Sequence, residues 1–261
     1  MWNYGKTVGV LVCGVALVAC AGAARGDIVG LNGLSGWTYN TADTAAPPVI
    51  VNNDLIQVTG GPNNRRSFWY NTPQDITSFQ MTFTYRASSI AASTNRQGIT
   101  FTMQNAGLNA LGSGGDGLGY QGITPSAAVT IAADTGPGQT YSAFYTGGLM
   151  GGGSAQVAPV NAFTFQNIDV TITYNGSILS VFMAQGANTY GPQNYLVGSL
   201  ASTVGGSTAL VGFTAATFNT LGAGGGATQF ISNVQFTAIP APASALLLLA
   251  GCPLAARRRR G

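Results

Sequence analysis

The chain has 261 residues and a formal net charge of +3, but this charge is not spread evenly along it. Residues 27–239 contain no Lys, His, Glu or Cys, and their four Arg stand against seven Asp, which gives this stretch a net charge of −3. The positive charge lies in the two end segments. This distribution excludes a basic nucleic-acid-binding face on the middle of the chain, so we expect no nucleic-acid partner.

The first 26 residues have the order of a secretory signal peptide. Lys6 precedes an apolar run over residues 7–21, and the small residues 21–24 follow as a site for signal peptidase. The run is too short to span a membrane comfortably. A second interpretation remains open, because Leu17-Val18-Ala19-Cys20 resembles the lipobox of bacterial lipoproteins, in which Cys20 would be lipidated. Both interpretations predict export.

Residues 27–239 are expected to form one all-β domain. Apolar and polar residues alternate over residues 79–86 and again over 170–174, which is typical of strands with one buried face. Asn175-Gly176 follows, a dipeptide favoured in type I′ turns, so residues 168–184 predict a β-hairpin. About a dozen short strands joined by Gly-rich loops indicate a sandwich or a barrel. All Cys lie in the end segments, so the domain can form no disulfide.

The residue types of this domain argue against catalysis. It has no Glu for a paired-carboxylate mechanism, no His to activate a Ser, and no Cys nucleophile. The seven Asp are scattered, and the two nearest in the sequence are Asp43 and Asp54. We therefore expect neither an enzyme nor a cofactor.

Several passages within residues 66–237 resemble the L-type, or legume-type, lectin domain. In chain order they are residues 98–104, 111–112, 115–123, 126–129, 210–217 and 230–237. The string Gly-Phe-Thr-Ala-Ala-Thr at 212–217 is the most specific of them. The resemblance implies an antiparallel jelly-roll β-sandwich of the concanavalin kind. It also implies carbohydrate binding at a shallow site that calcium supports.

The metal ligands of the family are not kept. Where the family's strand reads Val-Glu-Phe-Asp and supplies two carboxylates, this chain reads Val129-Thr130-Ile131-Ala132. Thr and Ala cannot replace two carboxylates as ligands of Ca²⁺. Asp134 would substitute only if the strand bulged by two residues, and bulges usually add one. We therefore carry over the fold and expect no metal site.

Some groups that suit a sugar are kept. Gln97 stands where the family has an Asp before the Gly of its sugar-binding strand, and Asn219 follows the 212–217 string in a Gly-rich loop. The loop at 114–117 can offer backbone N–H groups. The carbohydrate-binding candidates are Gln97, Gly115, Asp116, Gly117 and Asn219. Each also has an ordinary interpretation, as the start of a strand or as a turn residue.

Residues 240–261 form a third segment, in which Pro240-Ala241-Pro242 precedes a nearly apolar stretch and the cluster Arg257, Arg258, Arg259 and Arg260. This tail resembles the PEP-CTERM sorting signal of Gram-negative bacteria, with Ala241 where the family usually has Glu. Four arginines resist translocation, and the apolar stretch as a helix is about 21 Å long, short of a hydrocarbon core of about 30 Å. The resemblance implies transient anchoring by a short hydrophobic helix in the inner membrane and cleavage by an exosortase.

Together these features predict an exported protein of the cell envelope or extracellular matrix. Its lectin-like domain would bind carbohydrate weakly and without metal, with exopolysaccharide as the expected partner. The alternative that remains open is a structural envelope or matrix protein that binds no sugar.

Overall fold

The computed structural model describes residues 27–43, 47–89, 96–134, 138–151, 154–218 and 226–239. The predicted signal peptide with Cys20, the predicted sorting tail with Pro240, Pro242 and its arginines, and the candidate Asn219 lie outside the described residues. Within the described ranges, no helix has the length and apolar character needed to cross a membrane.

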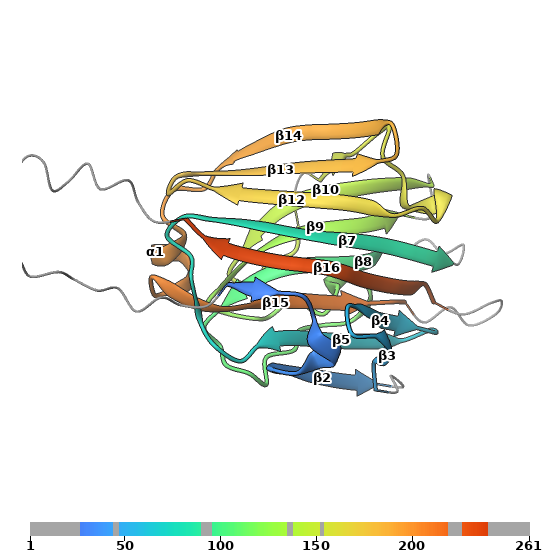
Figure 1. The fold of residues 1–261 in the computed structure, drawn as a ribbon, viewed down its shortest axis with the longest axis horizontal. Helices are drawn as coiled ribbons and strands as arrows, with labels where there is room; N and C mark the ends of the chain where they lie inside the picture. Colours follow the sequence, from blue (N-terminus) through green and yellow to red (C-terminus); the bar gives the residue numbers. More distant parts are fainter. Residues whose placement is uncertain are drawn as a thin grey trace, which may run out of the picture.

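Two antiparallel sheets, each with eight strands in the described residues, pack face to face (Figure 1). The first, the β7 sheet, has the order β14 (Asn188–Leu196), β13 (Ile178–Gln185), β12 (Ile168–Tyr174), β7 (Phe79–Ser89), β16 (Thr228–Ala238), β4 (Leu55–Gly60) and β3 (Val49–Asn52), and β1 (Ile28–Val29) also pairs with β16. The second, the β8 sheet, has the order β11 (Ala155–Gln156), β10 (Gln139–Thr146), β9 (Ser126–Asp134), β8 (Arg96–Gln104), β15 (Thr208–Ala216), β5 (Asn64–Tyr70) and β2 (Trp37–Asp43), and β6 (Gln74–Asp75) pairs with β15.

The all-β sandwich predicted from the sequence is confirmed. The described residues contain one short α-helix, α1 (Leu200–Val204), and three 3₁₀ turns, η1 (Asn32–Leu34), η2 (Gly115–Gly117) and η3 (Ala162–Thr164). Strands distant in the sequence are neighbours in each sheet, since β7 pairs with β16 and β8 pairs with β15. These pairings between strands that are far apart in the sequence give the jelly-roll arrangement. The pairing of β1 with β16 also places the first strand of the domain beside the last.

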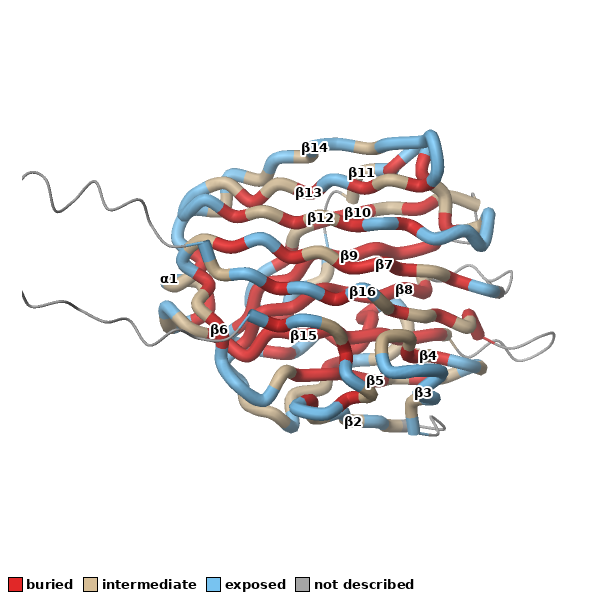
Figure 2. Tube along the Cα trace, in the orientation of Figure 1, coloured by how far each residue is buried: buried red, intermediate tan, exposed pale blue. Residues whose placement is uncertain are grey.

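The core lies between the sheets and is built by the alternating residues of the central strands. Phe79, Phe101, Phe213 and Phe236 come from four different strands and are almost fully buried. The rings of Phe79 and Phe236 are 5.0 Å apart, and those of Phe101 and Phe213 are 6.1 Å apart. Burying one such ring stabilises the fold by roughly 1.5–3 kcal/mol. Figure 2 shows the buried positions running through the middle strands.

The predicted hairpin is confirmed, because β12 pairs with β13 and Tyr174 lies opposite Leu179. The prediction of a type I′ turn is wrong. That turn needs a positive φ at both central residues, whereas Gly176 has a φ of 99° and Asn175 is not among the residues with positive φ. Instead the Asn175 Oδ1 atom accepts hydrogen bonds from the backbone N–H groups of Ser177 and Ile178. This side-chain bonding replaces the conformation that the sequence suggested.

The outer face of the β8 sheet is covered by residues 105–125, which we call the covering segment. Ser67 and the indole of Trp69 both donate hydrogen bonds to the Ala110 carbonyl, at 2.7 and 2.9 Å. The Thr214 hydroxyl donates to the Leu118 carbonyl at 2.7 Å. Trp69 is completely buried by this layer. The covering segment therefore fixes the position of η2, which it contains.

Candidate functional site

A pocket of about 470 Å³, which we call the η2 pocket, lies beside η2 at one end of the β8 sheet. It is lined by Asn63, Arg65, Ser113, Gly114, Gly115, Asp116, Gly117, Gln121, Thr217 and Phe218. Three of the five predicted sugar-binding residues, Gly115, Asp116 and Gly117, thus line one pocket. Asn219 directly follows Phe218 in the sequence but lies outside the described residues.

Strand pairing brings the two sides of the η2 pocket together. β5 runs antiparallel to β15, and Arg65 at the start of β5 lies opposite Ala216 at the end of β15. Beyond this pair, the backbone N–H of Thr217 donates to the Asn64 carbonyl at 2.9 Å, and the N–H of Asn64 donates to the Thr217 hydroxyl at 2.9 Å. These bonds hold Asn64, the first residue of β5, beside Thr217, which directly follows β15.

The η2 turn itself is held by its aspartate and its glycines. The Asp116 Oδ1 atom accepts a hydrogen bond from the backbone N–H of Arg96, at 2.7 Å, which ties the turn to the start of β8. Gly115 has a φ of +54°, and a Cβ atom at this position would lie 2.8 Å from the Phe218 ring. A side chain at residue 115 would therefore be strained and would displace Phe218.

Gln97 is placed differently from the η2 residues. Its side chain is only 1% exposed and does not line the η2 pocket. The Gln97 Oε1 atom accepts a hydrogen bond from the backbone N–H of Ala227, at 2.6 Å. This bond holds the residues before β16 against β8, next to the Arg96 backbone that anchors η2. Gln97 thus supports the frame of the site, and direct contact between Gln97 and a sugar stays a prediction.

The chemistry of the η2 pocket suits a polyhydroxylated ligand. The amides of Asn63 and Gln121 can both donate and accept hydrogen bonds, Asp116 accepts them and Arg65 donates them. The ring of Phe218 adds an apolar surface. Polar groups fix the orientation of a ligand in a small-molecule site, and the volume falls within the range of about 300–1,000 Å³ found for such sites. The lining here is more polar than is usual for such sites, which suits a ligand rich in hydroxyl groups.

The arginine that follows Arg65 has a different surrounding. The Arg66 side chain is buried and donates from Nη1 to the Val58 carbonyl at 2.7 Å, so it belongs to the frame between β5 and β4. Burial lowers the pKa of Arg66 from its ordinary value. Of these two adjacent arginines, Arg65 lines the η2 pocket and Arg66 does not.

The positions where the lectin family holds its metal do not fit Ca²⁺ in this chain. Thr130 and Ala132 are both buried in β9. The Thr130 hydroxyl oxygen accepts a hydrogen bond from the Ala143 N–H at 3.1 Å, and Ala132 has no side-chain oxygen. In the described part of the chain, no three His, Cys, Asp or Glu residues are grouped so that they could hold a metal. The expectation that no metal binds stays a prediction, since the Asp134 side chain is not described.

Reasoning from the sequence missed several residues of the η2 pocket, chiefly Arg65, Gln121 and Phe218. A signal was present for Phe218, which directly follows the Gly-Phe-Thr-Ala-Ala-Thr string. No local signal marked Arg65, because its place depends on the pairing of β5 with β15. Gln121 reaches the pocket only because the covering segment folds back over the sheet.

No protein-family model matches the chain. Among solved structures, the lectin of Bauhinia forficata in complex with GalNAc is 18% identical with a TM-score of 0.60, covering 81% of this chain and 98% of that one. Peanut lectin with a nine-residue peptide is 16% identical with a TM-score of 0.61, covering 82% and 97%. Arcelin-5, a lectin-like defence protein from Phaseolus vulgaris, is 15% identical with a TM-score of 0.59, covering 77% and 91%. The fold is therefore the legume-lectin jelly roll, which confirms the predicted lectin-like domain. At these identities the likeness concerns the fold alone.

Proposed function

We propose that this chain is an exported, non-enzymatic protein of the bacterial cell envelope whose lectin-like domain binds carbohydrate weakly through the η2 pocket. The observation that carries the proposal is the gathering of Gly115, Asp116 and Gly117 with polar side chains and the Phe218 ring around one pocket. The likeness to a lectin that holds GalNAc supports the ligand class. Exopolysaccharide is the partner that best fits an envelope protein of this kind.

Binding by this pocket should not require a metal. Thr130 and Ala132 stand in place of two carboxylates, and the anchor of η2 is a hydrogen bond from the Arg96 backbone to Asp116. Without a bound ion to order the surrounding loops, part of the binding free energy is spent on ordering them. Weak affinity is therefore expected, and it should be insensitive to chelation.

A glycan array with and without EDTA tests the proposal, using the variants Gln121→Ala and Phe218→Ala. Each removes one contact worth about 1 kcal/mol, so we expect each to weaken binding about fivefold. Gln80→Ala and Phe182→Ala are matched controls, because both side chains are solvent-exposed and neither lines this pocket. Binding unchanged in both η2 variants would place the sugar elsewhere. No binding to any glycan would favour the structural alternative.

The proposal of export rests on the two end segments of the sequence, the predicted signal peptide and the predicted sorting tail. The mature protein should begin between Cys20 and Asp27, and replacing Arg257–Arg260 with Ala should change its localisation or processing, because the charges hold the tail on the cytoplasmic side. N-terminal sequencing and cell fractionation measure both. An intact Met1 would contradict export, and an acylated Cys20 would identify a lipoprotein. Unchanged localisation and size of the arginine variant would count against an exosortase substrate.

A further inference from the structure

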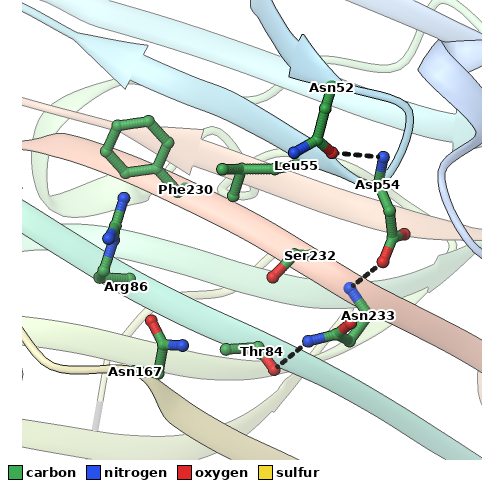
Figure 3. A pocket seen from close by; sticks show the side chains of 9 residues that line it. All are labelled: Asn52, Asp54, Leu55, Thr84, Arg86, Asn167, Phe230, Ser232 and Asn233. Carbon is green, nitrogen blue, oxygen red and sulfur yellow. Dashed lines mark hydrogen bonds between the residues drawn. The ribbon is translucent and has the colours of Figure 1, made fainter.

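A second pocket lies on the outer face of the β7 sheet, and the η2 pocket belongs to the other sheet. This second pocket, which we call the Arg86 pocket, has a volume of about 270 Å³. Its lining residues are Asn52, Asp54, Leu55, Thr84, Arg86, Asn167, Phe230, Ser232 and Asn233 (Figure 3). In β7 the side chains of Phe83 and Tyr85 belong to the core, so Thr84 and Arg86 between and beyond them face outward.

Of the described residues that line this pocket, Arg86 is the only cation, and an aromatic ring positions its guanidinium. The Arg86 Cζ atom lies 4.8 Å from the centroid of the Phe230 ring, a cation–π contact. Among the residues that the structure describes, no carboxylate pairs with this guanidinium and no group accepts a hydrogen bond from it. A half-buried arginine is thus held in place by stacking, with its N–H groups still available to a ligand.

The two carboxylates near the pocket are engaged with other groups. Asp54 accepts from the Leu31 N–H at 3.1 Å through one oxygen and from the Asn233 N–H at 3.0 Å through the other. Asp169 accepts from the Thr84 hydroxyl at 2.6 Å. Figure 3 shows Asp54 across the pocket from Arg86 and Phe230. Asp54 and Asp169 thus lie on opposite sides of β7 and accept hydrogen bonds from neutral donors, and within the described residues neither forms an ion pair with Arg86.

The remaining lining is suited to hydroxyl groups. Asn52 uses its Oδ1 atom to accept from the Asp54 N–H at 2.9 Å, so its amide N–H groups stay available. Asn167 and Ser232 add an amide and a hydroxyl that make no side-chain hydrogen bond within the described residues. The pocket is near the small end of the range for ligand sites, the size of one or two sugar rings rather than a large ligand.

We propose that the Arg86 pocket binds the carboxylate of an acidic saccharide, such as a uronate residue of a polysaccharide. The planar guanidinium would take the carboxylate with two parallel hydrogen bonds, which is the geometry that arginine favours. The side chains of Asn52, Asn167 and Ser232 would bond the ring hydroxyls. The Arg86 pocket and the η2 pocket share no lining residue and lie on different sheets, so the two proposals can be tested independently.

The test compares an oligogalacturonate with its fully methyl-esterified form, measured by isothermal titration calorimetry on the purified protein. The acid should bind at least about tenfold more tightly than the ester, because a charge-assisted pair is lost with the charge. Raising the salt concentration should weaken the binding of the acid and leave the binding of the ester unchanged. This comparison needs no variant, so it does not depend on any substitution folding correctly. Equal binding of acid and ester would overturn the proposal.

Variants then locate the site. Arg86→Gln should reduce the affinity for the acid to that for the ester, and Arg86→Lys should retain part of the preference, because it keeps the charge and loses the fork. Phe230→Ala should weaken binding, whereas Phe182→Ala, an exposed phenylalanine of β13, should not. Neutral-glycan binding at the η2 pocket should be the same in all four. An unchanged preference in Arg86→Gln, or acetate competing as well as the oligosaccharide, would contradict an acidic-sugar site.

Discussion

A buried chain of polar side chains supports the end of the sandwich where the η2 pocket lies. The Tyr85 hydroxyl donates to Gln229 Oε1 at 2.9 Å, and Gln229 Nε2 donates to the Thr59 hydroxyl at 3.0 Å. The Thr59 hydroxyl in turn donates to the Ala227 carbonyl at 2.7 Å, and the backbone N–H of Ala227 donates to Gln97 Oε1. Each polar group is satisfied by the next, so the removal of one leaves its neighbour unpaired in the interior.

Tyr85→Phe tests this network. The substitution leaves Gln229 Oε1 without its donor, so we expect a loss of about 1–3 kcal/mol in the free energy of unfolding at neutral pH. Tyr39→Phe, at an exposed tyrosine, should have little effect. Denaturant unfolding of both variants measures the difference. A Tyr85 variant as stable as the parent protein would mean that the network contributes nothing.

The same residue gives the stability a pH dependence, because burial raises the pKa of Tyr85. Below about pH 10, the ordinary pKa of tyrosine, both states keep the proton and the contribution is intact. Above it the unfolded chain releases the proton while the folded protein retains it, so stability falls by up to about 1.4 kcal/mol per pH unit. Tyr85→Phe should reduce this alkaline slope. Denaturant midpoints between about pH 8 and 11 measure it, and an identical slope would contradict the assignment.

Among the elements of the fold, the strands with clear alternation were predictable from the sequence. The alternation at 79–86 and 170–174 became β7 and β12, since each strand has one face in the core and one toward solvent. The two-residue strands β1, β6 and β11 are too short to show a period and exist only through their partners. The local sequence pattern thus identified the strands that are long enough to show alternation between a buried and an exposed face.

The covering segment was not predictable in the same way. Residues 105–125 contain few alternating positions, and their place is set by hydrogen bonds from Ser67, Trp69 and Thr214 to carbonyls of the segment. These donors lie on β5 and β15, distant in the sequence. The predicted η2 residues were therefore brought to a pocket for a reason that the sequence did not reveal. For Gln97, the sequence located the start of the strand but not the direction of the side chain.

At the scale of the whole molecule, the two sheets present two different polar surfaces. The β8 sheet carries the covering segment and the η2 pocket, whereas the β7 sheet carries the Arg86 pocket directly on its strands. A protein with binding sites on both sheets could hold two parts of one polysaccharide, or two chains of it. Two weak sites used together would raise the overall avidity without any new contact. The weak affinity expected of the η2 pocket is therefore compatible with retention in a glycan matrix.

The melting temperature of the whole domain also reports whether it has lost the calcium site of its fold. A ligand of the native state present at 100 times its Kd would add about 2.7 kcal/mol, which raises the midpoint by roughly 5–10 °C in a domain of this size. We expect no such rise in millimolar Ca²⁺ and no fall in EDTA, because the Thr130 hydroxyl is bonded to the Ala143 N–H and Ala132 has no ligand atom. Differential scanning calorimetry of the parent protein and of Asp134→Asn decides the matter. A rise of several degrees in Ca²⁺ that the Asp134 variant abolishes would mean that this carboxylate has rebuilt the site, and the prediction would be wrong.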